Sequence, residues 1–331
     1  MSYVSEKTRW GPIVNKKTLD DEYLGKIKDI VFQPVFILGL HRSGTTILYH
    51  MLNETENFNV LTLYHVLNFD RLLYDYDHDL IDEEKKRINQ LLEEKGITDR
   101  RTDAVKVTSE YEHEYMYVFS ERGYSWKLTE ENSEIFKILC KKIKYLSGDD
   151  KPVLLKNPYD YGNFLYIKKL FPHAKFVFIQ RNPLEVISST MKLWKTRLLR
   201  KDEFVCLYSR RSAQMYQNPL LLWGYRLFYT LRFPPGVFEV FWRAKAGTDS
   251  YLKNISQLPR GDFLSVRYED LCEKPNDVIT DILRFLGLNS KKDFTGYIKP
   301  RKLKLEPEVS ILRKYFYKKM KVYFDTFRYS L

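Results

Sequence analysis

The sequence predicts an α/β fold in which a central parallel sheet carries helices on both faces. Three short apolar runs are each followed by a helical pattern, an alternation typical of strand–helix–strand units. The runs lie at residues 35–38, 152–156 and 175–180. The length of 331 residues is ample for a sizeable core. We expect a single domain over residues 1–331, with a mainly helical insertion over residues 70–146.

A phosphate-binding loop is predicted directly after the first strand. Residues Gly39 to Gly44 have the four-residue gap of the GxxxxGK[ST] loop, in which glycines let backbone N–H groups converge on a phosphate at a helix N-terminus. Thr45 stands in place of the usual lysine, and Thr46 occupies the Ser/Thr position. Arg42, inside the loop, is therefore the candidate cation, because its planar guanidinium suits phosphate or sulfate oxygens. The structural alternative is a tight turn that leaves Arg42 in solvent.

The segment that follows the loop is predicted to be a helix from Thr45 to Asn53. Its apolar residues recur at helical spacing, which favours a helix packed against the sheet. The first turn of such a helix would direct its N–H groups at a bound phosphate.

Two further polar positions follow predicted strands. Lys156 is the last residue of the second strand, which places it at the carboxyl edge where open α/β sheets bind ligands. Arg181 directly follows the third strand, and Ser189 lies eight residues later, about two turns into the next helix.

The C-terminal part of the chain adds a strand and two helices. The strand is predicted to end at Val266, and a helix that includes Val278 stops at Gly287. The tail from Pro307 to Phe327 has an amphipathic helical pattern and is expected to cover the core.

The charge balance favours anionic partners. Lys and Arg total 55 against 43 Asp and Glu, which gives a net charge of +12. A nucleotide, a sulfated or phosphorylated substrate, nucleic acid and an acidic membrane surface all fit this charge. We do not expect nucleic acid, because no RNA-binding or helix-turn-helix signature accompanies the charge. Peripheral contact with a membrane stays open.

The cysteine pattern and the N-terminus favour a reducing compartment. Cys140, Cys206 and Cys272 lie far apart and include no CxxC pair, so the sequence suggests neither a disulfide framework nor a zinc site. The first residues, MSYVSEKTRWGP, lack the apolar core of a signal peptide. No apolar run approaches the roughly 18 residues of a membrane-spanning helix. We therefore expect a cytoplasmic protein.

Three ordered blocks resemble one enzyme family, the sulfotransferases that use 3′-phosphoadenosine 5′-phosphosulfate (PAPS). RSGTT at residues 42–46 resembles the 5′-phosphosulfate loop of the branch that includes the tyrosylprotein sulfotransferases. The stretch LKNPYDYGNFLYIKKLFPHAKFVFIQRNPLEVISS, residues 155–189, resembles the family over 35 consecutive residues. RYEDL at residues 267–271, followed by a proline and a helix ending in FLGL, is the third block. The resemblance covers about a third of the chain.

This resemblance implies a P-loop-containing nucleotide-binding fold with a helical acceptor lobe. It also implies a reaction, in which the enzyme transfers a sulfuryl group from PAPS to a hydroxyl of an unidentified acceptor and releases adenosine 3′,5′-bisphosphate. No metal ion is expected, because the loop lacks the lysine that accompanies Mg-triphosphate chemistry.

The resemblance further implies roles for particular residues. Arg42 and Lys156 would be catalytic cations near the transferring group. Arg181 and Ser189 would bind the 3′-phosphate, and Tyr268 would contact the adenine. The loop residues implied in donor binding are Arg42, Ser43, Gly44, Thr45 and Thr46.

The general base is the part of the site that the sequence leaves open. In many sulfotransferases an acidic residue roughly twenty positions beyond the loop arginine deprotonates the acceptor hydroxyl. Here that neighbourhood holds no carboxylate, and His65 is the nearest ionisable residue, with an ordinary pKa suited to the task. The alternative is a packed histidine that only satisfies a hydrogen bond. Glu112 and His113 are further candidates, although we interpret their segment, TSEYEHEYMYVF, as an exposed helical turn.

Two other regions carry expectations about the substrates. Residues Leu220 to Leu231 are apolar on nearly every face, so we predict a buried helix whose aromatic residues border the acceptor cleft. The basic segment around Arg301 is a weak match to the family's remaining 3′-phosphate contact, because its glycines are absent.

Two other classes of function remain compatible with the sequence. A nucleotide kinase or NTPase uses the same kind of loop, but the missing loop lysine argues against it. A catalytically inactive protein that binds a nucleotide or nucleic acid would explain the missing carboxylate base.

Overall fold

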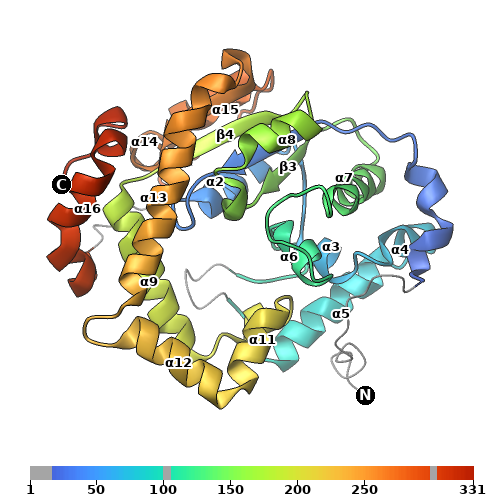
Figure 1. The fold of residues 1–331 in the computed structure, drawn as a ribbon. Helices are drawn as coiled ribbons and strands as arrows, with labels where there is room; N and C mark the ends of the chain where they lie inside the picture. The colour runs from blue at the N-terminus through green and yellow to red at the C-terminus, as the bar shows by residue number, and fades with distance from the viewer. Residues whose placement is uncertain (1–16, 100–105, 299–303) are drawn as a thin grey trace.

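Five parallel strands form a sheet at the centre of the protein (Figure 1). The computed structural model describes residues 17–99, 106–298 and 304–331. The strand order is β2-β3-β1-β4-β5. The strands are β1 Pro34–Leu38, β2 Asn59–Val60, β3 Val153–Lys156, β4 Lys175–Gln180 and β5 Phe263–Arg267. The predicted α/β fold with a central parallel sheet is confirmed.

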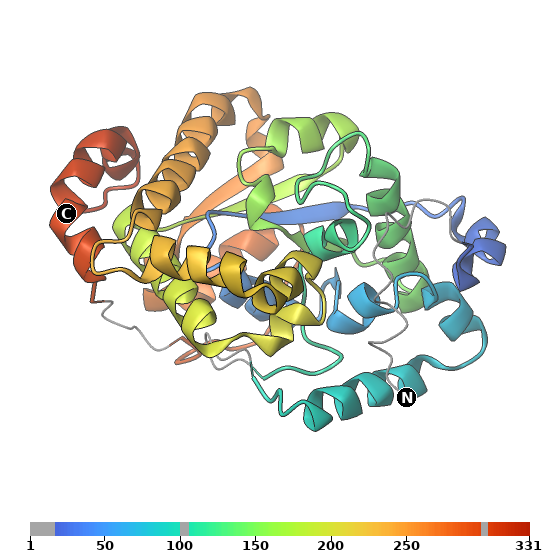
Figure 2. The same ribbon diagram turned by 60° about the horizontal axis from the view of Figure 1, so that its bottom comes forward.

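Helices connect the strands and cover both faces of the sheet (Figures 1 and 2). Those before β4 are α2 Thr45–Asn53, α3 Leu63–Leu67, α4 Leu72–Asp77, α5 Ile81–Glu94, α6 Met116–Ser120, α7 Ser133–Ser147 and α8 Phe164–Leu170. Those after β4 are α9 Pro183–Arg200, α10 Glu203–Cys206, α11 Arg210–Gln217, α12 Pro219–Thr230, α13 Gly236–Asn254, α14 Tyr268–Glu273, α15 Pro275–Phe285 and α16 Pro307–Thr326. The short 3-10 helices are η1 Leu19–Glu22, η2 Leu24–Ile27, η3 Pro158–Asp160, η4 Ile255–Gln257 and η5 Arg260–Asp262. None of the described helices has both the length and the apolar character needed to cross a membrane.

The two faces of the sheet are buried in two separate hydrophobic clusters, because successive side chains of a strand point to opposite sides. In β1, Phe36 and Leu38 belong to one cluster, which includes residues of α7, α8, α9, α13 and α16. Val35 and Ile37 belong to the other cluster, which includes residues of α2 and α15. All five residues of β1 are buried, as expected for a strand covered by helices on both sides.

The register of the central strands brings three loops to one edge of the sheet. Ile37 of β1 lies beside Lys156 of β3, and Leu38 lies beside Phe178 of β4. Because all three strands are parallel, their carboxyl ends meet where the loop 39–44 leaves β1. The loop therefore lies between Lys156, which ends β3, and the residues that follow β4.

The prediction of a buried helix over Leu220 to Leu231 is wrong. The helix forms, as α12, but Tyr229 is its only buried residue. Tyr229 packs its ring against Trp194 of α9, with ring centroids 4.6 Å apart. On the other side of α12, Leu220 is 81% exposed and Trp223 is 62% exposed. A helix that is apolar on nearly every face does not reveal from its sequence which face another element covers.

Replacing Phe136 of α7 by alanine should destabilise the fold strongly. Its ring is fully buried and stacks on Phe36 of β1 with centroids 5.8 Å apart, so truncation leaves a cavity between helix and sheet. We expect Phe136→Ala to lower the free energy of unfolding by about 3–5 kcal/mol in urea titrations. Phe228→Ala on α12 is the matched control, because that ring is 40% exposed. Similar losses for the two variants would contradict this packing.

Candidate active site

The loop after β1 needs glycine at both of its ends. A Cβ at Gly39 would lie 2.7 Å from the carbonyl oxygen of Ile179, which leaves no room for a side chain. Gly44 has a φ of +105° and carries the ring of Tyr268 directly above it, so a Cβ there would lie 2.3 Å from that ring. The two glycines thus allow the loop to pass close under β4 and α14 before α2 begins.

The interior of this loop suits an oxyanion. Ser43 is 1% exposed, and its Oγ has no hydrogen-bond partner among the residues that the structure describes. No side chain caps the N-terminus of α2, which begins at Thr45. A buried hydroxyl and uncapped helical N–H groups together favour binding of a phosphate or sulfate group.

Three predicted donor-binding residues meet on the β4 side of the loop. Arg42 donates from Nε to Oγ of Ser189 on α9, over 3.1 Å. Arg181 donates from Nη1 to the carbonyl oxygen of Arg42, also over 3.1 Å, and pairs with Glu185 over 2.9 Å. The arginine that follows β4 is therefore fixed to the loop itself, and its side chain is 9% exposed. Two guanidinium groups and a hydroxyl at one place form a site for an anion.

Tyr268, the first residue of α14, covers this group. Its ring centre lies 4.1 Å from Cζ of Arg181, a stacked cation–π contact. Burial raises the pKa of the Tyr268 hydroxyl to about 12, so the ring stays neutral at physiological pH. An aromatic ring next to the loop and the arginine can contact a nucleotide base.

Lys156 approaches the loop from the opposite side, at the end of β3. Its ammonium group donates to Oγ1 of Thr46 over 3.0 Å and lies 3.2 Å from a carboxylate oxygen of Glu114. The lysine is 1% exposed. A buried ammonium group is stable only with such partners, because its charge has lost its hydration. The structure thus brings a carboxylate to the residue predicted as a catalytic cation.

The segment that contains Glu112 and His113 is buried, so its interpretation as an exposed helical turn is wrong. Glu112 is 6% exposed and forms a β-bridge with Thr62. Its carboxylate accepts from Asn53 over 2.7 Å and lies 2.9 Å from Nδ1 of His50. Burial by itself would raise the pKa of Glu112, but the bonds from His50 and Asn53 lower it overall. The carboxylate is therefore held in its charged form by α2.

His113 lies in an aromatic environment. It is 3% exposed, and its ring contacts Tyr208 and Tyr117 edge-on, with centroids 4.4 and 4.8 Å away. Its Nδ1 accepts the backbone N–H of Glu114 over 2.9 Å. The histidine therefore helps to fix the backbone that carries Glu114 toward Lys156.

His65 is engaged in its own helix. It is the third residue of α3, and its Nδ1 accepts the backbone N–H of Thr62 over 3.0 Å, as part of a capping box. Burial, with a small contribution from the charge of Lys85, lowers the pKa of His65 to about 3. A histidine with this pKa and an occupied nitrogen binds a proton poorly at neutral pH. These features do not favour His65 as the base.

Sequence reasoning did not single out two residues of this site, Glu114 and His50. Glu114 was visible only as one member of an acidic group, and nothing in its spacing connects it to Lys156. His50 lies on the helix after the loop, one turn beyond Thr46, so helical periodicity could have indicated that it faces the same side. Arg301, predicted as a weak contact to the 3′-phosphate, lies outside the described residues.

A parallel sheet with a phosphate-binding loop at its carboxyl edge defines an α/β nucleotide-binding protein of the P-loop class. A family model described as "Sulfotransferase family" matches residues 34–234. The chain therefore belongs to the sulfotransferase family and is an enzyme of sulfuryl transfer. The family match gives no support to the kinase alternative.

Solved structures show the same fold. Sulfotransferase STF9 from Mycobacterium avium aligns with a TM-score of 0.65 at 16% identity, covering 94% of this chain and 81% of the other. Sulfotransferase STF1 from Mycobacterium tuberculosis H37Rv aligns with a TM-score of 0.54 at 16% identity, covering 90% of this chain and 80% of the other. No curated protein matches the chain in sequence.

The lowered pKa of His65 predicts a stability that falls in mild acid. Between the ordinary pKa of 6.5 and the folded value of about 3, the unfolded chain binds a proton at this residue and the folded chain does not. Stability should therefore fall as the pH falls through this range. His65→Gln keeps an acceptor for the capping box but does not titrate.

We expect wild type to lose about 1–2 kcal/mol more stability than His65→Gln between about pH 7 and about pH 5. Urea unfolding of both proteins at the two pH values measures the difference. Equal losses would show that His65 titrates normally in the folded chain.

Proposed function

We propose that this sulfotransferase uses PAPS as its donor and transfers the sulfuryl group to a hydroxyl of an acceptor. The observation that carries the proposal is the arrangement of two groups on either side of one loop. Arg42, Arg181 and Ser189 meet on the β4 side, and Lys156 and Glu114 meet on the β3 side. PAPS carries a 3′-phosphate and a reactive 5′-phosphosulfate on its ribose. Binding it therefore requires both of these groups of residues.

The β4 side supplies the site for the 3′-phosphate. Arg181 and Ser189 would bind its oxygens, and Arg42 lies near enough to share them, because its Nε already contacts Ser189. Charge-assisted hydrogen bonds from a guanidinium fork are among the strongest that a neutral-pH protein can offer a phosphate. Tyr268 would lie against the adenine, next to Arg181.

The loop and Lys156 supply the site for the 5′-phosphosulfate. Backbone N–H groups at the start of α2, with the side chains of Ser43, Thr45 and Thr46, would surround the phosphate that becomes the leaving group. Lys156 contacts Thr46 and would stabilise the negative charge that develops on the bridging oxygen. Since the ammonium group is already fixed by its partners, it needs little reorganisation as the charge develops.

Glu114 is the general base that this geometry supports best. In the proposed step, the acceptor hydroxyl gives its proton to the Glu114 carboxylate while its oxygen bonds to sulfur. The bond between sulfur and the bridging oxygen breaks at the same time, and the electron pair leaves with adenosine 3′,5′-bisphosphate. Glu114 is adjacent to Lys156 and its side chain is 17% exposed, so a substrate can reach it. The carboxylate of Glu112 is instead held by His50 and Asn53.

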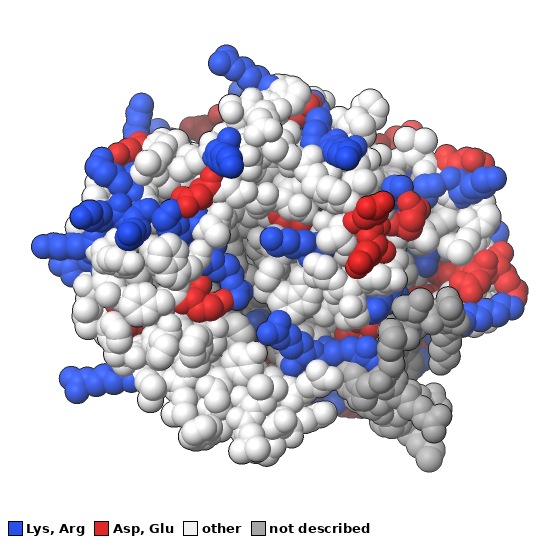
Figure 3. All heavy atoms as spheres, in the orientation of Figure 1, with Lys and Arg blue, Asp and Glu red and all other residues white. Residues whose placement is uncertain are grey.

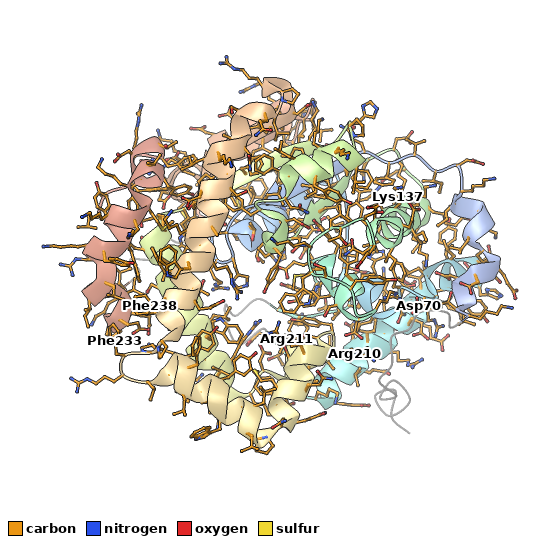
Figure 4. The ribbon with its side chains drawn as sticks, in the orientation of Figure 1. Asp70, Lys137, Arg210, Arg211, Phe233 and Phe238 are labelled. Atoms are coloured by element: carbon orange, nitrogen blue, oxygen red, sulfur yellow. The ribbon has the colours of Figure 1, made fainter. Side chains whose placement is uncertain are left out.

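We also propose that residues 70–146 form the acceptor lobe within a single domain, 1–331. This segment contributes Glu114 and also Trp126, whose ring lies 4.8 Å from that of Tyr159 and 5.8 Å from Cζ of Arg211. Figure 4 shows Arg211 directed toward the middle of the molecule, and Figure 3 shows basic side chains around the middle of this face. An aromatic and basic surface of this kind suits an aromatic or anionic alcohol as acceptor.

We also propose a cytoplasmic location, which the three free cysteines support.

The affinity for adenosine 3′,5′-bisphosphate should depend on Arg181. We expect wild type to bind this nucleotide more tightly than ADP, and Arg181→Ala to lose about 2 kcal/mol, equal to about thirtyfold in Kd. Isothermal titration calorimetry measures both. Arg284→Ala, on an exposed part of α15, is the matched control and should bind as wild type does. Equal affinity for ADP and the bisphosphate would sink the donor assignment.

Removal of the base should slow the chemical step without weakening nucleotide binding. We expect Glu114→Gln to lower kcat by about 10²–10⁴-fold with a phenolic acceptor, and to abolish the dependence of kcat on deprotonation of a carboxyl group. Calorimetry with the bisphosphate should show unchanged affinity. Glu110→Gln, on the same segment and exposed, is the control. If Glu112→Gln or His65→Gln lowered kcat and Glu114→Gln did not, the base would be one of those residues.

A further inference from the structure

The outer face of α12 and the loop after it form a continuous exposed apolar surface. Its large members are Leu220, Leu221, Trp223, Leu227, Phe228, Leu231 and Phe233, each between 38% and 81% exposed. Figure 3 shows a broad area without charged atoms over this part of the molecule, at the bottom of the view. Figure 4 places Phe233 at the outer end of this area, beside Phe238. We call these seven residues the α12 surface. Its inner neighbours, Tyr225 and Tyr229, stack on Trp194 and so fix the helix to α9.

The chain around the α12 surface is rich in arginine, and the nearest acidic residue after it, Glu239, accepts from Tyr229 and pairs with Arg243. Residues 204–238 contain four arginines and no aspartate or glutamate over 35 positions. Arg232 lies between Leu231 and Phe233 of this surface and is exposed, and Arg226 at the edge of α12 is also exposed and donates from Nε to the carbonyl oxygen of Leu198 on α9. A long segment with exposed Leu, Trp and Phe among arginines has the composition of helices that lie in a membrane interface.

Helix α16 extends this positive charge next to the α12 surface. Trp242 on α13 is 49% exposed and contacts Phe241, which in turn contacts Tyr315 on α16. The exposed positions of α16 include five basic residues, Arg313, Lys314, Lys318, Lys319 and Lys321. In Figure 3 basic side chains gather at the left, over α16, next to the uncharged area.

We propose that the α12 surface docks the enzyme onto a lipid bilayer that contains anionic lipids. The apolar side chains would enter the boundary between headgroups and acyl chains, with α12 parallel to the membrane plane. Trp223 and Trp242 would lie at headgroup depth, where indole rings are favoured. Arg232 beside α12 and the basic residues of α16 would attract the anionic headgroups. This docking does not depend on which donor or acceptor the enzyme uses.

Charge argues for a bilayer over a second copy of the chain. A symmetric dimer through the α12 surface would bring the same surface of both copies together. The exposed Arg232 of both copies would then be brought into one apolar interface, and Glu239, the carboxylate that contacts α12, is already paired with Arg243. Like charges brought together at a desolvated interface are costly, whereas anionic headgroups compensate them.

Vesicle flotation with the full chain tests the proposal. We expect wild type to float with vesicles of phosphatidylcholine and phosphatidylserine, less with phosphatidylcholine alone, and less as salt is added. The triple variant Leu220→Ser/Trp223→Ser/Phe228→Ser should lower the bound fraction at least about tenfold. A variant that carries Leu19→Ser and Val31→Ser, at exposed apolar positions near the N-terminal end of the described chain, should bind as wild type does.

Two other measurements distinguish docking from misfolding and from self-association. Transfer of the sulfuryl group to a small water-soluble phenol should be the same in wild type and the triple variant, because none of the three residues lies at the proposed active site. Tryptophan emission should shift to shorter wavelength with vesicles, and less so in Trp223→Phe. The proposal is overturned if wild type floats with neither kind of vesicle. It is also overturned if light scattering shows that wild type is a dimer and the triple variant a monomer.

Discussion

The parallel register of β1 with β3 and β4 is the constraint on which the rest of the site depends. These strands end at the same edge, where the loop follows β1, Lys156 ends β3 and Arg181 follows β4. Lys156 is paired with Ile37 in the sheet, so the position of its backbone cannot change unless the whole strand shifts. A one-residue slip would also exchange the two buried faces, because side chains alternate along a strand. The hydrophobic core therefore fixes the geometry of the polar groups.

Burial of Lys156 connects the sheet to the segment around Glu114. The ammonium group of Lys156, a residue 1% exposed, requires compensation, and the carboxylate of Glu114, 3.2 Å away, comes from this separate segment. The contacts of Glu112 with His50 and Asn53 attach the same segment to α2. The ion pair that compensates the buried charge of Lys156 thus also positions Glu114, the candidate base. The same segment approaches the loop that would carry the donor.

The two sides of the loop differ in the kind of cation they use. On the β4 side, Arg42 and Arg181 offer planar groups that are always charged and that bind through several N–H donors. On the β3 side, Lys156 offers a compact charge beside a carboxylate. The two proposed roles, recognition of a phosphate and stabilisation of a developing charge, place different demands on a cation. The arginines on the β4 side suit the first role, and the lysine on the β3 side suits the second. The positive charge of the chain is not confined to the site, since α16 carries it on the outer surface.

The sequence by itself determined the fold class and brought forward the residues of the proposed nucleotide-binding half of the site. Apolar runs, glycine spacing and helix signals placed the loop, Lys156, Arg181 and Ser189 within short stretches whose local geometry is set by nearby residues. Only the tertiary structure decided which carboxylate meets Lys156 and which side of α12 stays exposed. Both depend on contacts between segments far apart in the chain. Neither hydrophobic periodicity nor the spacing of ionisable residues contains that information, because packing between distant elements selects one partner among several of similar chemistry.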